Sequence, residues 1–95
     1  MRAQSGGAFA TIIHKGDVDS GSALINVRDG NAQHRLYTPA QGQDGSRVWL
    51  MSKADDEANI SEKIKKRLER DADLWVIEIE DRKGRHFLTE PIEGL

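Results

Sequence analysis

The sequence predicts an α+β fold, in which one amphipathic helix packs on one face of a mainly antiparallel sheet of five or six strands. β-rich segments separated by turn signals fill the first half of the chain. A later segment changes to a helical period, and the expected order is β-β-β-β-α-β-β. We expect strands at 8–14, 22–28, 31–38, 47–51, 72–80 and 85–88, and the helix at about 54–70.

The strongest turn signal in the first half is the dipeptide Asp-Gly at 29–30. It follows the segment SALINVR (22–28), in which apolar and polar residues alternate. Asp-Gly favours a two-residue hairpin loop, because both central residues of a type I′ turn need positive φ. The segment NAQHRLYT (31–38) would then return antiparallel and place Val27 opposite Ala32.

The helix is indicated by three apolar residues that recur every four positions, Ile60, Ile64 and Leu68. Charged residues lie between them, so the opposite face is expected to contact water. Ser52 or Asp55 can cap the start of the helix. Lysines and arginines gather toward its end, where they complement the negative end of the helix dipole.

The stretch DADLWVIEIEDRKGRHFL predicts a second hairpin near the C-terminus. Asp81 suits the first position of a type I turn, and Gly84 suits the fourth, with a left-handed backbone. Residues 85–88 would pair back on the strand at 72–80. The strand itself alternates, with Trp75, Ile77 and Ile79 on the apolar face and Glu78 and Glu80 on the wet face.

Length and composition place the chain among small single-domain proteins. It has 95 residues, 37% of them hydrophobic and 32% charged, which suits one folded domain over 1–95. The net charge of −2 gives no electrostatic sign of a nucleic-acid binder. Cysteine is absent, which excludes disulfides and thiolate chemistry. Neither a membrane span nor a signal-peptide core is present, so we expect a cytoplasmic protein.

Three segments, taken in order, resemble a known family. They are HKGDVDSGSALINV (14–27), LYTP (36–39) and DADLWVIEIEDRKGRHFL (71–88). Together they resemble the bacterial domain of unknown function 1491, found in alphaproteobacteria. The family is recorded without an activity, so the resemblance implies no catalytic residue and no cofactor.

The chain departs from the family pattern in two places. Ala72 stands where relatives usually carry proline, which loosens the corner before the last long strand. Relatives also begin with a longer amphipathic segment, whereas only MRAQSG precedes Gly7 here. We therefore expect a hydrophobic strip that is either exposed or covered by a second copy of the chain. Residues 89–95 are expected to form a tail.

Two alternatives to a simple binding role remain open. The first is a metal-dependent or hydrolytic protein. Three histidines can bind a zinc ion and leave its fourth position open, and aspartates can act together with them. The candidate residues are His14, His34, His86, Asp17 and Asp19. Asx-turns, however, account for the two aspartates without a bound ion. The second alternative is RNA binding by the basic helix face at 62–70, in which Glu62 and Glu69 interrupt the basic residues.

The sequence favours a non-enzymatic interaction module that binds a protein partner or a second copy of itself. No catalytic set, phosphate loop or nucleophile motif is present. Small domains rich in strands offer sheet faces and edges to partners. The candidate interaction residues are Trp49, Trp75, Tyr37, Asp17 and Asp19.

Overall fold

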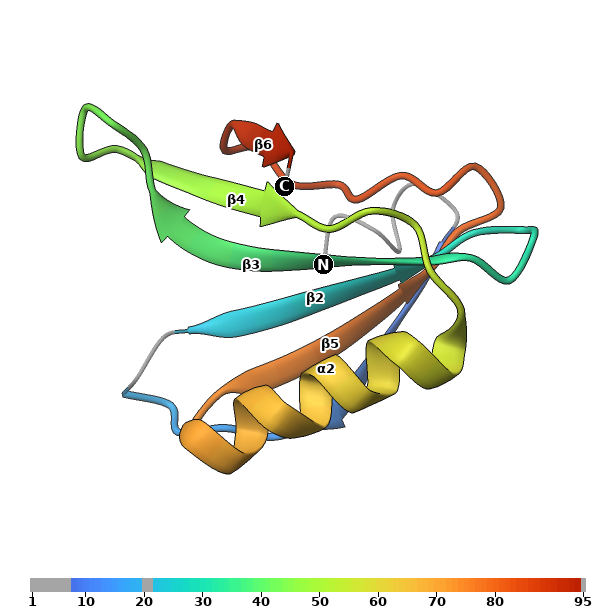
Figure 1. Cartoon of the computed structure of the whole chain (residues 1–95), viewed down its shortest axis with the longest axis horizontal. Coiled ribbons are helices and arrows are strands. Elements are labelled where there is room, and N and C mark those ends of the chain that lie inside the picture. The colour runs from blue at the N-terminus through green and yellow to red at the C-terminus, as the bar shows by residue number, and fades with distance from the viewer. Residues whose placement is uncertain (1–7, 20–21, 95) are drawn as a thin grey trace.

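The computed structural model describes residues 8–19 and 22–94, which form a six-stranded sheet and one α-helix (Figure 1). The spatial order of the strands is β1-β5-β2-β3-β4-β6. The elements are β1 (Phe9–His14), β2 (Ala23–Arg28), β3 (His34–Gln41), β4 (Arg47–Met51), α2 (Glu57–Arg70), β5 (Trp75–Glu80) and β6 (Ile92–Gly94). The order of elements along the chain is therefore the one that the sequence predicted.

The sheet is mixed, and the expectation of a mainly antiparallel sheet was wrong. β5 lies between β1 and β2, antiparallel to the first and parallel to the second. β6 pairs parallel with β4, whereas β2–β3 and β3–β4 are antiparallel. Parallel neighbours need long connections. Short-turn signals indicate only hairpin neighbours, so they could not reveal these pairs.

The predicted return strand at 85–88 does not form. The turn before it does form as expected, because the Gly84 N–H donates to the Asp81 carbonyl over 2.9 Å and Gly84 has φ 70°. Both edges of β5 are already occupied by β1 and β2, so β5 has no free backbone groups for a further strand. The chain instead runs on to β6, within the segment that was expected to be a tail.

The hairpin between β2 and β3 has a longer loop than predicted. Arg28 pairs with His34, so the loop spans 29–33 rather than two residues. The Asp29 carboxylate accepts hydrogen bonds from loop N–H groups, at 2.8 Å from that of Asn31. The left-handed residue is Ala32, with φ 59°. This side-chain turn replaces the type I′ turn, and the expected pairing of Val27 with Ala32 was wrong.

Hydrophobic clusters lie on both faces of the sheet. Figure 1 shows α2 across β5 on one face. The buried residues of the cluster that includes the helix are Leu24, Leu36, Ile60, Leu74 and Val76, with Ile64 and Leu68 packed against them. The other cluster has Ala8, Ile25, Val27, Tyr37 and Ile79 buried, and Phe87, Leu88 and Ile92 are among the residues packed against it. The segment after β5 thus covers the face opposite the helix.

The helix begins slightly later than expected. Asp56 is its N-cap, and the Asp56 carboxylate accepts from the Asn59 N–H over 2.8 Å. Ser52, one of the two predicted caps, is buried, and its hydroxyl accepts from the Leu36 N–H over 2.9 Å. Asp55, the other predicted cap, bonds the Asn59 side chain over 2.9 Å. In the described part of the chain no helix is long and apolar enough to cross a membrane.

Candidate functional site

The most prominent apolar surface lies on β1, which is an edge strand of the sheet. Three of its large side chains are exposed: Phe9 to 72%, Ile12 to 59% and Ile13 to 57%. Val18, in the turn that follows, is exposed to 77%. An apolar strand at a sheet edge is a surface on which further strands can pair. This surface agrees with the exposed hydrophobic strip that the sequence led us to expect.

A second feature is a hollow where β2 and β3 separate. Their ladder ends at the pair Ile25 and Tyr37. In the same register Leu24 would face Thr38 and then Ala23 would face Pro39, and proline has no N–H to continue the ladder. β3 and β4 remain paired beyond this point, and their arm curves away from β2 (Figure 1). A hollow of about 460 Å³ opens between the arm and the start of β2.

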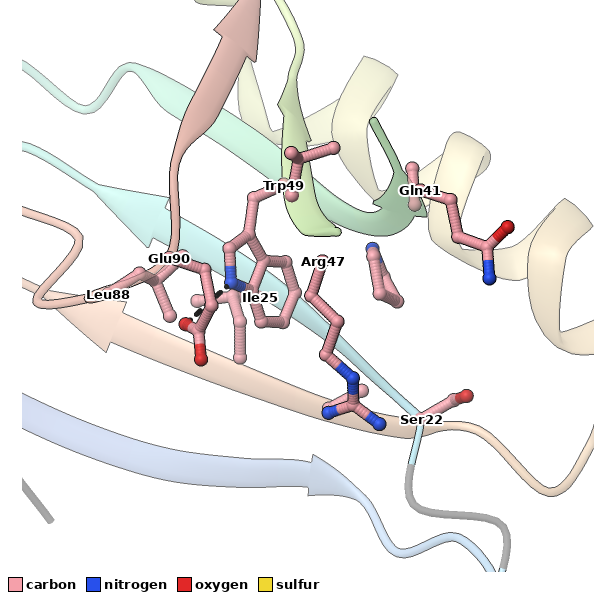
Figure 2. A pocket seen from close by; sticks show the side chains of 11 residues that line it. Ser22, Ile25, Gln41, Arg47, Trp49, Leu88 and Glu90 are labelled. Atoms are coloured by element: carbon pink, nitrogen blue, oxygen red, sulfur yellow. Dashed lines mark hydrogen bonds between the residues drawn. The ribbon is translucent and has the colours of Figure 1, made fainter. Parts of the chain in front are cut away.

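Trp49 forms a wall of this hollow (Figure 2). The indole is half-buried, and its Nε1–H donates to Glu90 Oε1 over 3.1 Å. Sequence reasoning named Trp49 as an interaction candidate but missed Glu90 and the hollow itself. Pro39, directly after the predicted strand at 31–38, was the available signal, since proline ends a ladder or marks an edge.

The turn at the end of β1 is held by hydrogen bonds that involve Trp75, Asp17 and Asp19. The Trp75 Nε1–H donates to the Asp17 carbonyl oxygen over 3.0 Å. The Asp17 carboxylate accepts from the Asp19 N–H over 2.8 Å, which is an Asx-turn. A side chain at Gly16 would collide with the backbone of residues 73–75. The geometry of this turn explains the aspartates and glycine without a ligand.

Tyr37 belongs to the core and is only 2% exposed. Burial raises the pKa of its hydroxyl above 10.0. Its ring lies 5.3 Å from that of His86, measured between centroids. A side chain so deeply buried cannot contact a partner on the surface, so Tyr37 is no interaction residue in this fold.

The three histidines lie at separate places. His14 is on the edge strand β1, whereas His86 packs against Tyr37 after β5. His34 is 1% exposed, and its Nδ1 lies 3.1 Å from Asn26 Oδ1. Across residues 8–19 and 22–94, no group of three or more His, Asp or Glu side chains could hold a metal. The structure therefore does not assemble the set on which the metal alternative depended.

Glu78 and Glu80 differ in their environments. Glu80 is exposed, as predicted. Glu78 is half-buried, and its Oε1 accepts a hydrogen bond from Asn26 Nδ2 over 3.4 Å. The expectation of a fully wet face was wrong for Glu78, because α2 covers part of the face on which it lies. His86, in the segment after β5, is half-buried as well.

The turn after β5 contains an ion pair between a buried carboxylate, that of Asp81, and the exposed side chain of Arg85. The Asp81 side chain is 4% exposed and accepts from Arg85 Nη2 over 2.7 Å. It also accepts from the Arg85 backbone N–H over 2.9 Å. These hydrogen bonds lower the pKa of Asp81 from 3.8 to about 2. The pair fixes the direction in which the chain leaves β5.

Most basic residues of α2 are exposed, and Arg67 is half-buried. Lys63, Lys65 and Lys66 are exposed, and the acidic Glu62 and Glu69 are exposed among them. Such alternation is typical of a solvated helix surface. RNA binding by 62–70 stays a hypothesis without a geometric feature in its favour.

The sequence pattern of a family described as "Protein of unknown function (DUF1491)" matches residues 1–89. The chain belongs to the DUF1491 family. This DUF1491 protein is 42% identical to a DUF1491 family protein from Caulobacter crescentus CB15 whose crystal structure is solved at 1.87 Å. The match covers 97% of this chain and 88% of the relative, with a TM-score of 0.89.

Two further solved structures support the DUF1491 fold. An NMR structure of a DUF1491 family protein from the same organism is also 42% identical, with a TM-score of 0.84, and the match covers 97% of this chain and 86% of that one. A solution structure of an A. tumefaciens protein, 24% identical, has a TM-score of 0.78 over 97% of this chain and 86% of its own, and shows the fold alone. None of the curated proteins matches this chain. DUF1491 has no assigned activity, so no site residue is carried over.

Proposed function

We propose that this protein is a non-enzymatic interaction module that self-associates by pairing β1 with β1 of a second copy. The observation that carries the proposal is the exposed apolar edge of β1, formed by Phe9, Ile12 and Ile13. Two copies related by a twofold axis would align their β1 strands antiparallel. Backbone hydrogen bonds would then join the two sheets, while the apolar side chains leave water.

The contrast between the two sheet edges supports β1 as the pairing strand. The opposite edge is β6, which has three residues, Ile92–Gly94, and includes the exposed Glu93. Short edge strands and charged side chains both discourage further pairing. β1 has six residues and no lysine, arginine, aspartate or glutamate. A partner strand therefore meets fewer obstacles at β1.

A β-bulge limits the length of the regular edge. The register between β1 and β5 shifts between Ile12 and His14, so Ile13 has no direct partner on β5. Phe9 to Ile12 remain in regular register with β5. We therefore expect a short β1–β1 ladder centred on Thr11, in which Ala10 faces Ile12 of the second copy, with Ile13 contributing apolar contact beside it.

Replacing Ile12 with lysine should weaken self-association. A charged side chain on the edge must lose water when a partner strand approaches, which opposes pairing. We expect a concentration-dependent dimer for the wild type in sedimentation equilibrium and at least a tenfold weaker association constant for Ile12→Lys, roughly 1.4 kcal/mol or more.

Val18→Lys is the matched control for this experiment. Val18 is more exposed than Ile12, at 77% against 59%, but lies beyond the end of β1. The two variants introduce the same charge, so a specific edge interaction should leave Val18→Lys dimeric. A wild type that remains monomeric at high concentration would refute the proposal, and so would equal weakening by both substitutions.

A further inference from the structure

The hollow between β2 and the β3–β4 arm has the size and lining of a small-molecule site. Its volume of about 460 Å³ lies within the range of roughly 300–1,000 Å³ that is usual for such sites. Most of the lining side chains are apolar or aromatic, and the polar ones are those of Ser22, Gln41, Arg47 and Glu90. The side chains that give it this character are those of Ile25, Pro39, Val48, Trp49 and Leu88.

The Trp49 indole is held in place by its neighbours. Its Nε1–H is bonded to Glu90 Oε1 at 3.1 Å, and its backbone N–H donates to the Pro91 carbonyl at 2.9 Å. A ring whose polar edge is fixed presents its face as a rigid apolar wall. Figure 2 shows this ring standing over the hollow, with Glu90 on one side and Arg47 on the other.

Arg47 supplies the positive charge of the hollow. Figure 2 shows its guanidinium reaching past Trp49 toward Ser22, across the mouth of the hollow. Among the residues that the structure describes, the Arg47 guanidinium has no hydrogen-bond or ion-pair partner, although several other charged side chains do. A guanidinium is charged at every physiological pH and offers a planar set of donors that suits carboxylates and phosphates.

We propose that this hollow binds a small organic anion with a flat apolar body. The body lies against Trp49 and the apolar floor, and the acid group pairs with Arg47. The indole separates Glu90 from Arg47 in the view of Figure 2, so the acid group of the ligand faces the cation rather than the carboxylate. This role is independent of β1, because the residues that line the hollow come from β2 and the residue before it, from β3, from β4 and from the segment after β5.

Titration followed by NMR of the ¹⁵N-labelled protein tests the proposal. The probes are phenylacetate, phenyl phosphate, inorganic phosphate and the neutral analogue benzyl alcohol. We expect the two aromatic anions to shift the indole N–H signal of Trp49, with Kd of about 1 mM or lower, while that of Trp75 stays in place. The stronger of the two anions identifies the preferred acid group.

Two variants separate charge recognition from general apolar binding. Arg47→Gln should weaken the aromatic anions at least tenfold, whereas Arg70→Gln, which removes the same charge from the exposed end of α2, should leave Kd unchanged. Both positions are exposed, and a dispersed spectrum confirms that each variant is folded.

Three outcomes would overturn the proposed site. The first is the absence of saturable shifts at about 10 mM probe, which is far above the expected Kd. The second is equal binding of benzyl alcohol and phenylacetate, which would mean that Arg47 recognises no anion. The third is binding of inorganic phosphate as tight as that of phenyl phosphate, which would mean that the apolar wall contributes nothing. None of these outcomes bears on self-association through β1.

Discussion

Asp81 is the residue whose chemistry most affects the local structure. Its buried carboxylate accepts from the Arg85 side chain and backbone, and its carbonyl accepts from the Gly84 N–H. These bonds hold the turn that directs the chain from β5 onto the opposite face of the sheet, where Phe87 packs. The sequence indicated the turn through Asp81 and Gly84, but not the ion pair, because Arg85 was assigned to a strand.

The ion pair between Asp81 and Arg85 should make the stability of the protein depend on pH. The pKa of Asp81 is lowered from 3.8 to about 2 in the folded protein, chiefly by hydrogen bonds from Arg85. A lowered carboxyl pKa stabilises the folded state above the unfolded value, and this contribution disappears as pH falls from about 4 to about 2. Urea denaturation should therefore show Asp81→Asn less stable than wild type at pH 7, with the difference shrinking over that range. If the stability difference between Asp81→Asn and the wild type stays constant down to pH 2, the charge of the carboxylate does not contribute to stability.

At the scale of elements, the helix and the order of strands could be predicted from sequence, whereas the neighbours of β5 could not. The spacing of Ile60, Ile64 and Leu68 is a local property, so the sequence identifies the helix directly. The place of β5 between β1 and β2 depends on contacts between residues about 50 to 70 positions apart, such as Ile25 with Ile77. No turn residue encodes such a pair.

A substitution at Ile60 tests how strongly apolar packing holds α2 on the sheet. The Ile60 side chain is fully buried, in a cluster with Leu24, Leu36 and Val76. Ile60→Ala should reduce the free energy of unfolding by about 2–5 kcal/mol, because it leaves a cavity as well as removing apolar contact. Glu62→Ala, at an exposed position of the same helix, should change it by no more than about 0.5 kcal/mol. Equal effects of the two substitutions in thermal or urea unfolding would show that α2 is not anchored by its apolar side.

At the scale of the whole molecule, both proposed sites arise from the way the sheet ends. β1 presents its apolar side chains because it lies at the outer edge, and the hollow opens because Pro39 ends the β2–β3 ladder. The sequence indicated an exposed hydrophobic strip and singled out Trp49. It could not place the strip on β1 or join Trp49 to Arg47, because both depend on which strands are neighbours.

The central claim, that β1 pairs with β1 of a second copy, is tested most directly by a single cysteine in that strand. The natural sequence has no cysteine, so Thr11→Cys provides one thiol per chain. A twofold axis through Thr11 would place the two thiols opposite each other, and Cβ atoms of facing residues lie about 5 Å apart. Mild oxidation should then give a covalent dimer rapidly, and Thr89→Cys, exposed but outside β1, should give little. Equally slow cross-linking of both variants, at concentrations where the wild type sediments as a dimer, would contradict pairing through β1.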